Sequence, residues 1–108
     1  MKFRPYAFLG LAAKAGKVVS GEERCEKAVK EGFVKLIIVS RDASDNTKRK
    51  FKDLCKYKGV DFRIFGEKIL LGKYIGKDMR AVIGILDVEF SKQLIKLIDD
   101  QSSGIGGV

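Results

Sequence analysis

The run Leu36-Ile37-Ile38-Val39 restricts the possible folds more than any other part of the chain. Four consecutive apolar residues predict a central strand that is buried on both faces, because a strand with one solvent-facing side alternates apolar and polar residues. A strand of this kind must be covered by other elements on both sides. The run therefore predicts a layered fold.

Helical and extended segments alternate along the rest of the chain. We expect helices at residues 5–15, 21–31 and 67–75, another between the caps Asp42 and Ser44 and the terminating Gly59, and a last helix capped by Asp87. Further strands are expected at 17–19, at 60–64, where Val60, Phe62 and Ile64 alternate with polar residues, and at 81–86. This alternation predicts one α/β domain over residues 1–100, with helices on both sheet faces. The small and polar residues 101–108 predict a disordered tail.

The chain is strongly basic. Its 108 residues include 22 Lys and Arg against 14 Asp and Glu, which gives a formal net charge of +8. Such an excess in a small domain favours an anionic partner, most often nucleic acid. A merely soluble surface remains the alternative. No segment is long enough to span a membrane.

The chain has no histidine and only two cysteines, Cys25 and Cys55. Both cysteines stand at apolar positions of helical segments, which predicts that they lie in the core of a protein in the reducing cytoplasm. The missing histidine removes the commonest general base and the commonest zinc ligand. We therefore expect no metal and no cofactor, and an enzyme ranks last among the possible functions.

The first residues allow two interpretations. Lys2 and Arg4 precede an apolar stretch, and Ala13-Lys14-Ala15 resembles a signal-peptide cleavage site. However, Pro5 stands where the first turn of a helix favours proline, and the apolar stretch is short and ends at Lys14. We favour a buried first helix over a signal peptide.

The start of the second helix carries the most informative local pattern. Ser20 followed by Glu23 fits a capping box, and Cys25, Ala28 and Val29 give the helix one apolar face. A helix N-terminus among cations can also receive a phosphate. The alternative is a solvated helix face, stabilised by the i,i+4 pairs Glu23–Lys27 and Glu26–Lys30.

Residues 9–23 and 34–48 closely resemble the kink-turn-binding ribosomal protein family, and Lys56-Tyr57, Gly59-Val60 and 71–77 continue the match. The similarity covers about residues 5–98. The resemblance implies a three-layer α-β-α sandwich with a small mixed four-stranded sheet. It also implies binding of structured RNA through the start of the second helix and the loop before the last strand. We expect a cytoplasmic, ribosome-associated protein, and a small basic domain of this kind is most simply a monomer.

In this family the second helix opens with the pattern Gly-x-Asn-Glu-x-x-Lys. Gly21 and Lys27 match its ends, whereas Glu23 and Arg24 replace the Asn and the Glu. An Asn side chain both donates and accepts hydrogen bonds, while an ionised Glu only accepts and repels phosphates. The replacement favours a second hypothesis, in which the chain is a protein-interaction module that has lost kink-turn recognition.

The second family segment falls at residues 76–81. It is apolar in kink-turn binders, but here only Met79 keeps that character, while Lys77 and Arg80 favour phosphate contact. Gly21 and Gly76 also have a purely structural explanation, the backbone freedom of glycine. The predicted RNA contacts are Lys14, Lys17, Gly21, Glu22, Glu23, Arg24, Lys27, Lys77, Met79 and Arg80.

Overall fold

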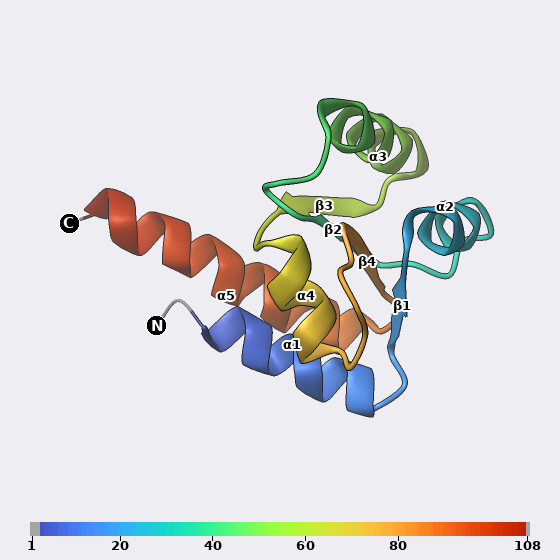
Figure 1. Ribbon diagram of the computed structural model, residues 1–108. Coiled ribbons are helices and arrows are strands. Elements are labelled where there is room, and N and C mark those ends of the chain that lie inside the picture. The colour runs from blue at the N-terminus through green and yellow to red at the C-terminus, as the bar shows by residue number, and fades with distance from the viewer. Residues whose placement is uncertain (1–2, 108) are drawn as a thin grey trace.

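A computed structural model describes residues 3–107 of the chain (Figure 1). The elements follow in the order α1 (Arg4–Lys14), β1 (Val18–Ser20), α2 (Glu22–Lys30), β2 (Leu36–Val39), α3 (Asp45–Lys58), β3 (Asp61–Ile64), α4 (Lys68–Tyr74), β4 (Val82–Ile85) and α5 (Val88–Gly107). Helices and strands thus lie close to the segments that the sequence predicts.

The four strands form one mixed sheet in the order β1-β4-β2-β3. β2 is parallel to β3 and antiparallel to β4, and Leu36 pairs with Ile85 while Val39 pairs with Val82. All four residues of β2 and all four of β4 are buried. The prediction of a central strand buried on both faces is confirmed.

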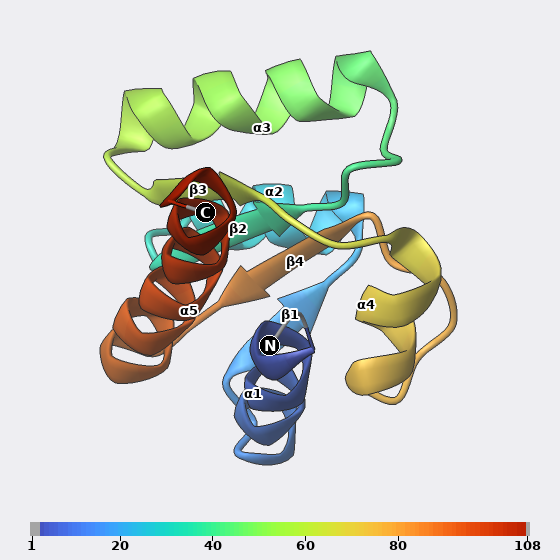
Figure 2. The same cartoon turned by 90° about the vertical axis from the view of Figure 1, so that its left-hand side faces the viewer.

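Helices cover both faces of this sheet. α2 and α3 lie on one side, and α1, α4 and α5 lie on the other, as the two views show (Figures 1 and 2). The predicted three-layer α-β-α arrangement is confirmed. No helix within residues 3–107 has both the length and the apolar character needed to cross a membrane.

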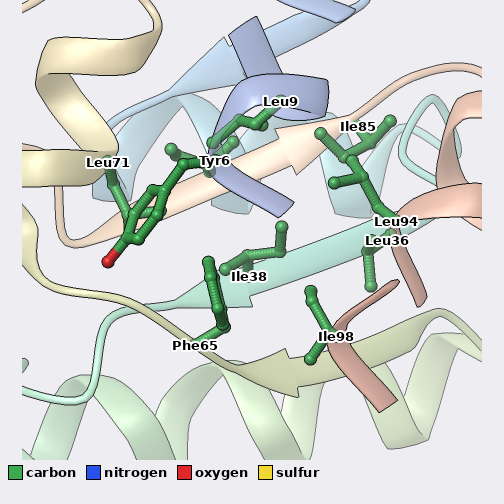
Figure 3. Close-up of a cluster of buried hydrophobic side chains, with 10 residues drawn as sticks. Tyr6, Leu9, Leu36, Ile38, Phe65, Leu71, Ile85, Leu94 and Ile98 are labelled. Carbon is green, nitrogen blue, oxygen red and sulfur yellow. The ribbon is translucent and has the colours of Figure 1, made fainter. Parts of the chain in front are cut away.

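A separate hydrophobic cluster lies between the sheet and the helices on each of its faces. On the α1–α4–α5 side, Leu36 and Ile38 of β2 pack with Leu9, Leu94 and Ile98 of the helices (Figure 3). On the α2–α3 side, Ile37 and Val39 point into a cluster that includes Val29, Phe51 and both cysteines. Alternate residues of one strand therefore supply both cores.

Tyr6 fixes α1 within the first cluster. Its ring stacks on Tyr74 at 5.3 Å between centroids and contacts Phe65 at 4.9 Å. Its hydroxyl accepts a hydrogen bond from the backbone N–H of Glu67 at 3.0 Å. The predicted first helix is thus present and buried on one face.

Two of the three predicted caps form, whereas the carboxylate of Asp42 accepts from the N–H of Lys68 at the start of α4, at 3.0 Å. Ser44 accepts a hydrogen bond from the N–H of Thr47 at 3.1 Å, and Asp87 accepts one from the N–H of Phe90 at 2.9 Å. Each satisfies a backbone donor that the first turn of a helix leaves free. Gly59 ends α3 in the left-handed conformation, with φ of 72°.

The structure differs from expectation at the edge strand β3 and after residue 100. Phe62 packs against the α2–α3 cluster, but Ile64 is 38% exposed because it lies at the far end of an edge strand. Residues 101–107 are helical rather than an irregular tail, since α5 continues to Gly107. Helical hydrogen bonding extends residue by residue from a helix already formed, and no proline stops it here.

The turn between α4 and β4 depends on Gly72, which is buried. Its carbonyl accepts a hydrogen bond from the N–H of Lys77 at 2.8 Å, so the chain folds back over α4. A Cβ atom on Gly72 would overlap the backbone carbonyl of Asp78. Only glycine allows this close approach of two backbone segments.

We expect Gly72→Ala to lower the free energy of unfolding by about 3 kcal/mol, because the overlapped atoms are backbone and cannot move aside cheaply. Gly76→Ala is the control: Gly76 has φ of 76° but no atom within 4 Å of an added Cβ. That change should cost about 1 kcal/mol through backbone strain alone. Urea unfolding measures both values, and equal effects would contradict the steric argument.

Cys25 and Cys55 are buried, as predicted from their apolar positions. Burial raises the pKa of the Cys25 thiol to about 12 and that of Cys55 to about 11. We expect neither thiol to react with a chromogenic disulfide reagent near neutral pH in the folded protein, because the thiolate is the reactive form. Both should react in denaturant. Rapid reaction of either thiol in the native protein would contradict this assignment.

Candidate nucleic-acid interface

An open groove of about 510 Å³ lies between the start of α2 and the loop that joins α4 to β4. Its lining comes from two segments far apart in the sequence: Ser20, Gly21, Glu22, Glu23 and Arg24 on one side, and Met79, Arg80 and Ala81 on the other. Strand pairing brings the segments together, because Ser20 is paired with Ile83 and the N–H of Gly21 donates to the carbonyl of Val82 at 3.0 Å.

Gly21, and not Ser20, occupies the N-cap of α2. Its φ of 97° and ψ of 149° belong to a region that other residues rarely adopt, and within residues 3–107 no side chain caps this helix start. The predicted capping box is therefore wrong. Ser20 is the last residue of β1, and its pairing with Ile83 holds it in the sheet, away from the N–H of Glu23.

The Ser20 side chain instead fixes Arg80 across the groove. Its Oγ accepts a hydrogen bond from Nε of Arg80 at 3.1 Å, while Nη1 of Arg80 donates to the carbonyl of Met79 at 3.0 Å. The backbone N–H of Arg80 donates to the carbonyl of Lys68 at 3.0 Å. The guanidinium is thus held in one orientation beside the groove, and its other N–H groups remain for a ligand.

Met79 is the large apolar residue of the lining. Its side chain is 59% exposed, although methionine is usually buried. An exposed apolar side chain beside a fixed guanidinium suits a ligand that has both a flat apolar face and a negative charge.

The two carboxylates at the start of α2 have different surroundings. Glu22 contacts α3, where Nζ of Lys50 lies 3.4 Å from its Oε1 and Thr47 Oγ1 donates to its Oε2 at 3.3 Å. Lys50 also lies 2.7 Å from Glu26, which pairs with Lys30 at 2.9 Å as predicted. These two lysines lower the pKa of Glu26 to about 2.

Glu23 has no such partner. Within residues 3–107 no ion pair joins it to Lys27, so this predicted pair is absent, and both side chains are exposed. Of the two carboxylates Glu22 and Glu23, Lys50 offsets only the charge of Glu22. Glu23 is thus the carboxylate that a ligand in the groove would meet.

Of the ten predicted contact residues, the structure brings six together in the groove: Gly21, Glu22, Glu23, Arg24, Met79 and Arg80. Lys27 lies about one turn beyond Arg24 on α2, and Lys77 lies exposed in the loop before Met79. Lys14 and Lys17 do not join them. The carbonyl of Lys17 accepts from the N–H of Leu86, at the opposite end of β1 from Ser20.

Sequence reasoning missed two residues of the lining, Ser20 as the anchor of Arg80 and Ala81 beside it. The sequence pattern around Ser20 predicted a capping box with Glu23, which is a contact between neighbours in the chain. No local pattern could reveal a hydrogen bond to a residue sixty positions away.

Comparison with known proteins gives consistent results. Residues 6–95 match the ribosomal protein L7Ae/L30e/S12e/Gadd45 family. The chain is 39% identical to the RNA-binding protein YlxQ of Bacillus subtilis (strain 168), over 87% of this chain and 94% of that protein. It is 26% identical to the large ribosomal subunit protein eL8 of Cenarchaeum symbiosum (strain A), over 92% of this chain and 79% of that protein. These names are those of RNA-binding and ribosomal proteins rather than of enzymes.

Solved structures show the same fold. A Bacillus halodurans protein of unknown function superposes with a TM-score of 0.86 at 43% identity, over 89% of this chain and 97% of its own. A 15.5 kD RNA-binding protein of Giardia lamblia gives a TM-score of 0.74 at 20% identity, over 91% and 84% of the two chains. The matches confirm the resemblance drawn from the sequence. The chain belongs to the ribosomal protein L7Ae/L30e/S12e/Gadd45 family.

Proposed function

We propose that the protein binds structured RNA of the kink-turn type in the groove between α2 and the α4–β4 loop. The observation that carries this proposal is the meeting of the two family segments in one groove, with six of the predicted contacts in its lining. RNA binding as such is supported by family membership and by the names of the YlxQ relatives. We further propose a monomeric, ribosome-associated protein in the cytoplasm.

The phosphate backbone would be held at the start of α2. Since no side chain in the described part of the chain caps this helix, N–H groups of its first turn remain available to an anion. Arg24 and Arg80 stand on the two sides of the groove and supply charge-assisted hydrogen bonds. A Cβ on Gly21 would meet no atom within 4 Å, so the space above this residue is open to a close approach.

Base recognition would combine Met79 and Glu23. RNA-binding proteins read unstacked bases by packing against their faces and by hydrogen bonds to their edges. The exposed Met79 offers the apolar contact. The Glu23 carboxylate can only accept, so it would select amino or imino N–H groups of a base, where the family's Asn can both donate and accept.

The first test compares a kink-turn RNA with a matched straight duplex over a series of salt concentrations. We expect the kink-turn RNA to bind more tightly, and the preference to persist at higher salt. Lys27→Ala should weaken binding and reduce the salt slope by about one unit, because one phosphate contact is lost. Lys96→Ala, an equal change of charge on α5, is the control. Unchanged affinity and slope for Lys27→Ala would mean that the proposed site is wrong.

The second test removes the Glu23 carboxylate from the groove. Glu23→Asn restores the family's residue, and we expect several-fold tighter binding of the kink-turn RNA, because one close repulsion between the carboxylate and a phosphate is worth about 1 kcal/mol. Glu31→Asn, at the other end of α2, removes the same charge outside the groove and should change affinity far less. Weaker binding by Glu23→Asn would mean that the hydrogen bonds accepted by the carboxylate outweigh its repulsion of the phosphates, and would contradict the expected gain.

The alternative is a protein-interaction module that keeps the fold without kink-turn recognition. It would be favoured if kink-turn and duplex RNA bound equally and both were released by salt. Binding to a protein partner that survives nuclease treatment would then distinguish it from an RNA-dependent association.

A further inference from the structure

A second cavity, of about 380 Å³, lies at the other end of α2 from the groove. It is enclosed by the C-terminal ends of α2 and α3, the starts of β2 and β3, and the first turns of α5. Its apolar lining comes from Val29, Val34, Val60, Val88 and Ile95. We call it the α2–α5 pocket. Neither the proposed RNA contacts nor the family resemblance uses it.

Exposed apolar residues lie in the lining of the α2–α5 pocket and next to it in the sequence. Val88 in the lining is 45% exposed. Phe33 stands between lining residues Gly32 and Val34 and is 61% exposed, and Tyr57 precedes lining residue Lys58 and is 85% exposed. Exposed apolar side chains bordered by charges are typical of interaction sites.

The border of the pocket is positively charged. Lys35, Lys58 and Lys92 contribute to the lining, against one carboxylate, that of Asp61. Within the described residues, Lys35 and Lys58 form no ion pair, and Lys92 has only a contact of 3.9 Å with Glu89, between two largely exposed side chains. Such exposed contacts contribute little. The three ammonium groups are therefore available to an acidic partner.

Backbone groups already bond carbonyls at the adjoining helix ends. The N–H of Phe33 donates to the carbonyl of Ala28 at 3.0 Å, and the N–H of Val60 donates to that of Cys55 at 2.9 Å. These bonds satisfy carbonyls in the last turns of α2 and α3. The lysines are thus not required as partners of these two carbonyls.

We propose that the α2–α5 pocket is a docking site for a protein segment that carries Asp or Glu residues beside one apolar side chain. The apolar side chain would occupy the aliphatic lining, and the carboxylates would pair with Lys35, Lys58 and Lys92. The aliphatic character of the cavity and the carboxylate of Asp61 disfavour a nucleic-acid backbone here. α2 separates the two sites by about 14 Å, so one molecule can hold RNA and this segment together.

The test selects peptides from a random display library against the full chain and measures their affinity by fluorescence anisotropy. We expect the selected peptides to be enriched in Asp or Glu beside Leu, Ile or Phe. Their binding should weaken about tenfold when Lys35, Lys58 and Lys92 are all changed to Ala. The matched control changes Lys52, Lys73 and Lys96 to Ala, which removes the same charge from exposed positions elsewhere and should leave peptide affinity nearly unchanged.

Val88→Glu is a second variant, chosen because the side chain is already 45% exposed, so folding should tolerate it. It places a negative charge at the pocket and should also abolish peptide binding. The proposal is overturned if no peptide is selected, if the selected peptides lack acidic residues, or if they bind the pocket variants as well as the unchanged protein.

RNA binding provides the remaining control. The two triple-lysine variants should bind the kink-turn RNA equally, since both lose three charges outside the groove. A selective loss of RNA affinity in the pocket variant would assign this surface to RNA and overturn the docking proposal. If Lys27→Ala and Glu23→Asn left RNA affinity unchanged, the proposed RNA site would be wrong, but the peptide results would still test the α2–α5 pocket. Each proposal can therefore fail without the other.

Discussion

The antiparallel pairing of β2 with β4 determines where the hydrophobic clusters and the two candidate sites lie. Both strands are buried over their full length, and their side chains supply the hydrophobic clusters on the two sheet faces. Because the strands run in opposite directions, their first residues lie at opposite ends of the sheet. Ala81, directly before β4, borders the groove, and Lys35, directly before β2, borders the α2–α5 pocket. The two candidate sites are thus separated by the geometry of a single strand pair.

Sequence patterns predicted those elements that depend on neighbouring residues in the chain. The apolar run of β2, the cap Asp87 and the terminating Gly59 all lie where the sequence placed them. The prediction failed at Ser20, where the same residues that fit a capping box are held by a neighbouring strand. It also failed at Ile64, because periodicity cannot tell that a strand lies at the edge of a sheet.

The groove could be predicted only in part. The family resemblance identified both of its segments, but it could not show that Glu22 contacts Lys50 while Glu23 forms no ion pair within residues 3–107. Lys14 and Lys17 were predicted as additional phosphate contacts, and they lie before β1 and outside the lining of the groove. No sequence pattern predicted the α2–α5 pocket, because each of its residues fits a helix end, a strand start or the core when it is considered alone.

The hydrogen bond between Ser20 and Arg80 has a consequence for the energetics of recognition. Immobilising a long side chain on binding costs about 0.5–1.5 kcal/mol in conformational entropy. Arg80 is already held by Ser20 and by the carbonyl of Met79, so this entropy is lost when the protein folds and not when it meets its partner. Lys77, three residues earlier, is exposed and must still be ordered on contact. Two cations of the same loop therefore contribute unequally to affinity.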